Sequence, residues 1–139
     1  MADILVVEDD EEVRKLAVSI LEAAGHETRS AASTTEAHAI IRSDAKFDVL
    51  FVDFTLLDDN DAGLEDRYAG LDLAQEAASF RPGLRVVYTT GRVIKDGMVS
   101  LFVQPSVFLA KPYRSEQLVR AVDHVLNAPQ HVDPPQSDY

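Results

Sequence analysis

The sequence contains no cysteine and no tryptophan. Without cysteine the chain has no disulfide, no thiolate ligand for a metal and no cysteine nucleophile. Long apolar runs are also missing, because no stretch approaches the roughly 20 apolar residues that a membrane helix needs. The N-terminus, MADILVVEDD, lacks the basic segment that begins a signal peptide. We therefore expect a chain that does not enter a membrane and that works in the cytoplasm.

Positive charge is scarce: 13 lysines and arginines face 24 acids, which gives a formal net charge of −11. Binding to nucleic acid needs a clustered Lys/Arg surface that releases counterions, so we expect no nucleic-acid partner. The length of 139 residues and the 46% hydrophobic content fit one domain with one sizeable core.

Short apolar runs that stop at polar residues predict the strands. Ile4 to Val7 ends at three acids, and Val49 to Val52 ends at Asp53. Such continuous runs are typical of strands buried on both faces of a parallel sheet. The pattern predicts two further buried strands and one weaker strand. The five predicted strands cover residues 4–7, 27–29, 49–52, 84–88 and 107–109.

Apolar residues at helical spacing predict three helices. One covers residues 13–24, one begins at about residue 34, and one covers residues 118–126 after the last strand. A helix between about 93 and 101 is less well patterned, since it contains Gly97. Strands that alternate with helices form a parallel sheet with helices on both faces, so the fold class is α/β, doubly wound. The expected helix ends are Gly25 as a stop and Thr34 or Thr35 and Ser115 as N-caps.

Ligands of such sheets bind outside the carboxyl ends of the strands. A cluster of carboxylates repels itself and is usually offset by a hard cation with oxygen ligands, preferably Mg²⁺. A lysine and hydroxyl groups beside it suit an anion, and the combination fits phosphoryl transfer. The residues at the predicted strand ends are Glu8, Asp9, Asp10, Asp53, Thr89, Thr90 and Lys111.

Four motifs, VVEDD, FDVLFVD, VVYTTGR and VFLAKPY, occur at these strand ends. Together they resemble the receiver domains of two-component response regulators, over about residues 2 to 127. The resemblance implies a flavodoxin-like, five-stranded parallel sheet in the order 2-1-3-4-5. It also implies a receiver domain over residues 1–127, and we expect residues 128–139, rich in proline, to be a disordered tail.

The resemblance implies a phosphorylation site at Asp53 and a metal site beside it. Asp9 and Asp53 would bind Mg²⁺, with Mn²⁺ as the alternative ion, directly, and Glu8 would act through water. The backbone carbonyl of Thr55 would complete the protein ligands, and Asp10 would lie outside the site. Taken singly, Asp9 and Asp53 are equally well explained as helix caps or loop acids.

The resemblance also implies a phosphoryl-binding and switching set. Lys111 would bind the phosphoryl group and precede a cis peptide to Pro112, a bond that proline allows at low cost. Thr90 fits the switch hydroxyl better than Thr89, since a small residue follows it. Phe108 matches the switch aromatic, although on sequence alone it is better explained as a core residue.

The sequence departs from the family after Asp53, where an acidic insert at about residues 56–69 precedes Gly70. The insert could add a metal ligand, shield the phosphoryl group, form a partner surface or be a solvated loop. In the family that the sequence resembles, the positions of Thr55 and Arg92 influence how quickly water reaches the acyl phosphate. The sequence therefore does not predict the lifetime of the acyl phosphate.

We expect a phosphoacceptor domain that takes a phosphoryl group from a sensor histidine kinase or a histidine phosphotransfer protein and then changes a partner-binding face. It would not be a turnover enzyme, and it would be a monomer or weak homodimer. A natural single-domain protein, favoured by Met1 close to the first strand, and the receiver of a hybrid histidine kinase share this chemistry.

Two other classes of protein are alternatives to a receiver domain. A Mg²⁺-dependent aspartyl-phosphate phosphatase would place a second aspartate two residues after the first, where this chain has Thr55. A flavodoxin-like binding module would need a phosphate-cradling loop after the first strand, where the acids at 8–10 would repel a phosphate.

Overall fold

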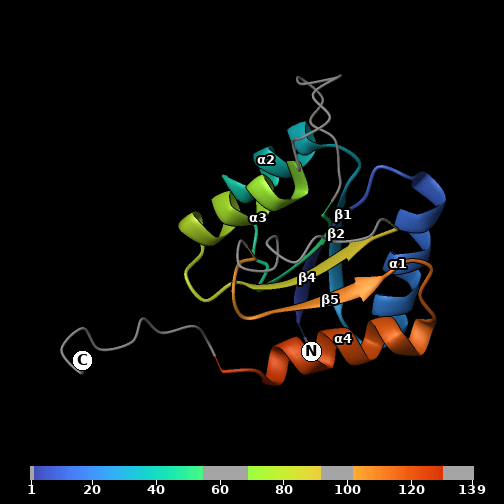
Figure 1. Ribbon diagram of the computed structural model, residues 1–139. Coiled ribbons are helices and arrows are strands. Elements are labelled where there is room, and N and C mark those ends of the chain that lie inside the picture. Colours follow the sequence, from blue (N-terminus) through green and yellow to red (C-terminus); the bar gives the residue numbers. More distant parts are fainter. Residues whose placement is uncertain (1, 55–68, 92–101, 130–139) are drawn as a thin grey trace.

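The computed structural model describes residues 2–54, 69–91 and 102–129. The strands and helices are β1 (Asp3–Val7), α1 (Glu11–Ala23), β2 (Glu27–Ala31), α2 (Thr34–Ile41), β3 (Val49–Asp53), α3 (Ala69–Phe80), β4 (Arg85–Thr90), β5 (Ser106–Ala110) and α4 (Ser115–Asn127). Strands and helices alternate as far as β4, as the sequence predicts, and β4 and β5 flank residues 92–101, which are not described (Figure 1).

The five strands form one parallel sheet in the order β2-β1-β3-β4-β5. Helices α1 and α4 cover one face, and α2 and α3 cover the other (Figure 1). The predicted doubly wound, flavodoxin-like sheet with the order 2-1-3-4-5 is therefore confirmed.

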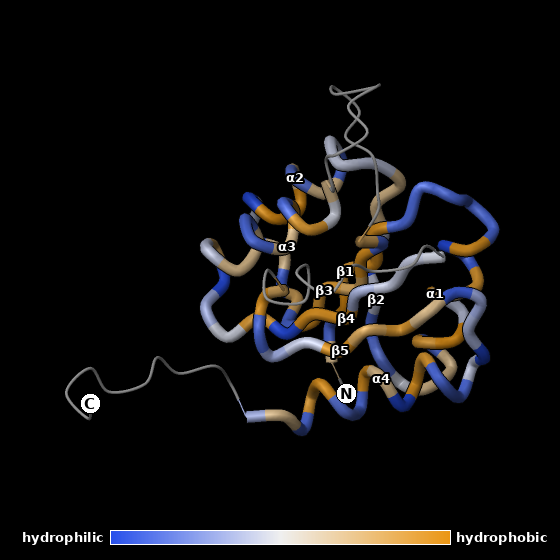
Figure 2. Tube along the Cα trace, viewed as in Figure 1, coloured by the Kyte–Doolittle hydropathy of each residue, from blue (hydrophilic) through white to orange (hydrophobic). Residues whose placement is uncertain are grey.

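The central strands β1 and β3 are apolar on both sides because helices bury both (Figure 2). Successive side chains of a strand point to opposite faces, so each strand feeds two separate cores. One core lies under α2 and α3 and includes Leu5, Val7, Leu50 and Val52. The other lies under α1 and α4 and includes Ile4, Val6 and Phe51.

Strand β5 is less buried than its apolar sequence predicts. It is the edge strand, and of its five residues only Leu109 is buried, against the α1/α4 core. Phe108 points to the other face and is 37% exposed. The expectation of a buried strand, and of Phe108 as a core residue, is wrong because a run of apolar residues does not reveal whether a strand lies at the centre or the edge.

Two helices begin at other residues than expected. Ser33 caps α2, with an extended backbone and a side chain that accepts a hydrogen bond from the Glu36 amide at 3.2 Å, so Thr34 and Thr35 lie inside the helix. Arg114 occupies the N-cap position of α4, and Ser115 is its first helical residue. Neighbouring hydroxyl residues are equivalent in sequence, and the backbone conformation decides which one caps. Gly25, with φ of 94°, follows α1 as expected.

Helix α3 passes close to the end of β3. A Cβ added to Gly70 would lie 2.0 Å from the backbone oxygen of Asp53, so only glycine fits at this position. Ala69, the last residue of the expected insert, is the first residue of α3.

Several expectations fall outside the described residues: Thr55, Arg92, the helix at 93–101, the remainder of the insert at 56–68 and most of the tail. Among the residues that are described, no helix is long and apolar enough to cross a membrane.

Candidate functional site

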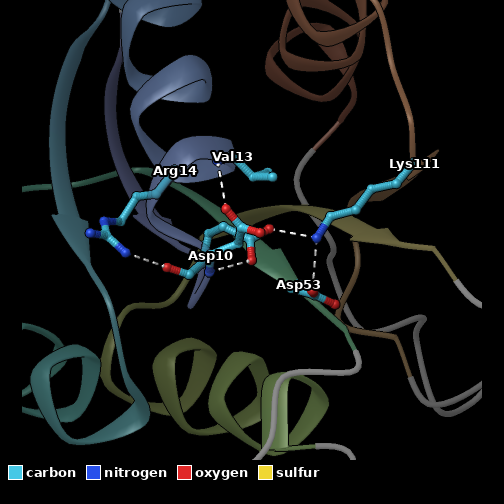
Figure 3. Close-up of polar contacts among 6 residues, drawn as sticks. Asp10, Val13, Arg14, Asp53 and Lys111 are labelled. Carbon is cyan, nitrogen blue, oxygen red and sulfur yellow. Dashed lines mark hydrogen bonds and ion pairs between the residues drawn. The ribbon is translucent and has the colours of Figure 1, made fainter.

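Side chains from three strand ends meet at the carboxyl edge of the sheet (Figure 3). The ammonium of Lys111, directly after β5, contacts Glu8 Oε1 at 2.6 Å and Asp53 Oδ2 at 2.9 Å. Glu8 follows β1 and Asp53 ends β3, the strand beside it. The parallel topology thus brings Lys111 to Glu8, 103 positions away in the sequence, and to Asp53, 58 positions away.

Three carboxylates gather around this cation. Glu8, Asp9 and Asp53 each offer an oxygen, and these oxygens lie within 4.8 Å of one another. Glu8 and Asp53 are buried, whereas Asp9 is exposed, so the cluster is accessible from the side of Asp9. When ionised, the three carboxylates and one ammonium leave two negative charges, and oxygen ligands with this charge fit a hard divalent cation.

Burial raises the pKa of Glu8, and the hydrogen bonds from Lys111 and from the Asp10 amide act against this rise. For Lys111, burial acts to lower the pKa, but the hydrogen bonds to Glu8 and Asp53 outweigh it and raise the pKa. Lys111 therefore keeps its positive charge at neutral pH, and this charge balances part of the buried acid.

The first turn of α1 holds the acidic segment. The Asp10 amide donates to Glu8 Oε2 at 3.1 Å, and Asp10 Oδ1 accepts from the Val13 amide at 3.1 Å, which caps the helix (Figure 3). Arg14 Nη1 donates to the backbone oxygen of Glu8 at 3.0 Å. Sequence reasoning left Asp10 outside the site and missed Arg14. A bond to a backbone oxygen leaves no pattern of residue types that could have revealed it.

The strand register distinguishes Thr90 from Thr89. Tyr88 belongs to the core under α2 and α3 and is paired with Phe108 of β5. Paired residues of neighbouring strands point to the same face, as do residues two apart in one strand. Thr90 and Phe108 therefore share the α2/α3 face, and Thr89 points to the opposite one. Thr90 is 1% exposed.

The Lys111–Pro112 peptide is cis, as expected, and a second cis peptide, Gln104–Pro105, was not predicted. Tyr113 follows and packs edge-on against Phe51, with ring centroids 6.1 Å apart. The site is thus backed by the α1/α4 core.

A lysine, a buried carboxylate at a strand end, two further acids and a nearby hydroxyl suit the transfer of a phosphoryl group to a carboxylate. The carboxylate supplies the nucleophile, and the lysine stabilises negative charge on the phosphoryl oxygens. Phosphoacceptor domains and phosphatases that form an aspartyl phosphate share this chemistry.

Solved structures similar to this chain include receiver domain proteins. A response regulator receiver protein from Sinorhizobium medicae WSM419 is 28% identical to this chain and superposes with a TM-score of 0.76. The match covers 91% of this chain and 94% of the Sinorhizobium chain. A CheY-like receiver domain protein from Methanospirillum hungatei JF-1 is 24% identical, with coverage of 91% and 94% and a TM-score of 0.74. At that identity, the likeness shows the fold alone.

NtrX from Brucella abortus is 32% identical, with a TM-score of 0.71 over 90% of this chain. The match spans only 26% of the NtrX chain, so this chain corresponds to one part of that larger protein. A comparison with curated protein sequences found no match.

The sequence pattern of the response regulator receiver domain matches residues 4–123. This range contains β1 through most of α4, and with it Glu8, Asp53 and Lys111, which meet at the sheet edge. Fold, sequence pattern and site coincide, and the chain therefore belongs to the receiver domain family of two-component response regulators.

Proposed function

We propose that Asp53 is the phosphoacceptor of a two-component phosphorelay. The observation that carries the proposal is the position of Lys111 Nζ, 2.9 Å from Asp53 Oδ2 and 2.6 Å from Glu8 Oε1. A fixed cation beside the nucleophile lies where negative charge develops on the phosphoryl oxygens during transfer, and it stabilises that charge. The donor would be a phosphohistidine on a sensor histidine kinase or on a histidine phosphotransfer protein.

In the transfer step, a carboxylate oxygen of Asp53 attacks phosphorus while the P–N bond to the histidine breaks. The imidazole leaves with the electron pair of that bond and takes up a proton. Lys111 stays protonated and turns toward the phosphoryl oxygens, which become part of an acyl phosphate. Positioning and charge neutralisation supply the catalysis, so no base on the protein is needed.

Asp9, Asp53 and Glu8 are the described residues that would hold a Mg²⁺ ion, with the backbone carbonyl of Thr55 as a further ligand. Mn²⁺ has the same preference for oxygen ligands. When bound, the ion neutralises charge on the phosphoryl oxygens and reduces repulsion among the three carboxylates.

The output follows from the shared face of Thr90 and Phe108. The hydroxyl of Thr90 would move toward the new phosphoryl oxygen, and Phe108, now 37% exposed, would turn inward. A local charge change would thus alter the surface around β5, where a partner protein binds. Thr55 and Arg92 would set how long the acyl phosphate lasts. The domain would act in the cytoplasm as a signalling module and not as a turnover enzyme.

The test is the intact mass of the protein after incubation with Mg²⁺ and phosphoramidate. The wild type should gain one phosphoryl group, and Asp53→Asn should gain none. Asp48→Asn is the matched control, because Asp48 precedes β3 at the opposite end of the strand, where its carboxylate accepts a hydrogen bond from the Asp3 amide at 2.9 Å. An adduct on Asp53→Asn, or none on the wild type together with no binding of beryllofluoride, would refute the proposal.

A further inference from the structure

Asp9 is the exposed member of the acidic cluster, yet its backbone is held on both sides. An exposed carboxylate on a loop would lose side-chain and backbone freedom when it binds a cation, and this loss weakens binding. The contacts of the neighbouring residues show how the freedom of the backbone is already restricted.

The first contact fixes the peptide unit before Asp9. The Glu8 carbonyl and the Asp9 amide belong to one planar unit, so a hydrogen bond to this carbonyl orients the whole plane. Arg14 Nη1 donates that bond at 3.0 Å, from the first turns of α1 (Figure 3). Arg14 is only partly exposed, so water competes less for the bond than at a free surface.

The second contact fixes the peptide unit after Asp9. The Asp10 amide donates to Glu8 Oε2 at 3.1 Å, and the other oxygen of the same carboxylate binds Lys111. With both flanking planes oriented, the φ and ψ angles of Asp9 are set, and only its side-chain torsions remain to be chosen.

We propose that Arg14 is a positioning residue for the cation site: it orients the peptide between Glu8 and Asp9 so that the Asp9 carboxylate points into the acidic cluster. This inference rests on the proposed function, since it concerns the cation that the cluster would bind. Arg14 itself does not touch the cation.

If Arg14 acts only through its charge, replacing it should strengthen cation binding, and if it positions Asp9, replacing it should weaken cation binding. Removing a positive charge close to a cation site should strengthen cation binding if charge alone matters. Removing a partner that orients a ligand typically weakens metal binding by about 10–100-fold. Arg14→Met keeps the apolar stem and removes the guanidinium, so the direction of the change identifies the role.

Lys15→Met is the matched control. Lys15 is the next residue of α1, carries the same charge and forms an exposed ion pair with Glu11 at 2.9 Å. Binding of Mn²⁺ would be measured by counting the free ion with electron paramagnetic resonance. We expect about tenfold weaker binding or more for Arg14→Met, and unchanged or slightly tighter binding for Lys15→Met.

A readout without metal separates this inference from the proposed function. In the metal-free protein, Arg14→Met should remove hydrogen-exchange protection from the Asp10 amide, whereas Lys15→Met should leave it unchanged. If wild type binds no Mn²⁺, the proposed cation site fails and the inference fails with it, while the exchange result still shows whether Arg14 orders the backbone around Asp9.

Unchanged or tighter Mn²⁺ binding by Arg14→Met, or an unaltered Asp10 amide, would overturn the inference. Thermal unfolding without metal shows whether the variants are folded. If Arg14→Met does not fold, Arg14→Lys replaces it: its shorter stem and single ammonium cannot reach the carbonyl in the same way, so a smaller loss of affinity in the same direction is expected.

Discussion

Replacing Gly70 with alanine should change the stability of the fold in two opposite ways, through helix propensity and through a steric clash. Alanine is the better helix former and should stabilise α3 by up to about 1 kcal/mol. The added methyl, however, would lie 2.0 Å from the Asp53 backbone oxygen and 3.0 Å from Phe54 Cα. These are backbone atoms at the end of a central strand, so they cannot turn away as a flexible side chain would.

The size of the clash decides the outcome. Ordinary contact begins at 3.4 Å, so α3 or the end of β3 must move by at least 1.4 Å. Overpacking of a dense interior usually destabilises by about 1–3 kcal/mol, which exceeds the gain in helix propensity. We expect a net loss of about 1–2 kcal/mol in the free energy of unfolding, together with slower phosphorylation, because the displaced carbonyl belongs to Asp53.

Urea unfolding and phosphoramidate labelling measure the two effects. Gly91→Ala is the control, since among the described residues its methyl would meet only Lys111 Cβ, at 3.9 Å. If Gly70→Ala were as stable as the wild type and accepted phosphate at the same rate, the close approach of α3 to Asp53 would not constrain the site.

Two further predictions concern buried titratable groups. Burial raises the pKa of Tyr88 and of Tyr113 from 10.0 to about 12, so their neutral forms stabilise the fold below pH 10 and this contribution is lost as the pH rises toward 12. Absorbance of tyrosinate, compared with Tyr88→Phe and Tyr113→Phe, should show two late-titrating phenols, and titration of both near pH 10 would contradict their burial. Lys111→Met should destabilise the fold by about 1–3 kcal/mol at pH 8, because the carboxylate of Glu8 is left buried without its cation. Burial raises the pKa of Glu8, so protonation should remove most of this loss in urea unfolding at acid pH, and an equal loss at both pH values would argue against the pair.

The sheet and most of the site were predictable because they depend on patterns along the chain. The runs before Glu8 and Asp53 are apolar throughout, and only strands buried on both faces tolerate this. The alternation of strands and helices then brings their carboxyl ends together, and Lys111 with them.

Features that depend on the third dimension were not predictable. The expected strand order already placed β5 at the edge, but it did not reveal that Leu109 would be covered by the α1/α4 core while Phe108 stays 37% exposed on the other face. The contact of Arg14 with the Glu8 carbonyl involves a backbone acceptor that every residue possesses. The Ser33 cap was missed because three adjacent hydroxyl residues offer the same chemistry. The roles of Thr55 and Arg92 stay predictions.

The contact between Gly70 and the Asp53 carbonyl also means that the sixteen residues between them leave and return at nearly the same point. For a connection with its ends pinned together, the closure entropy grows only with the logarithm of its length, and doubling the length costs only about 0.6 kcal/mol. A receiver built in this way tolerates an insert directly after the end of β3. The length and charge of this segment can therefore change from one protein to another while the strand end that carries Asp53 stays where it is.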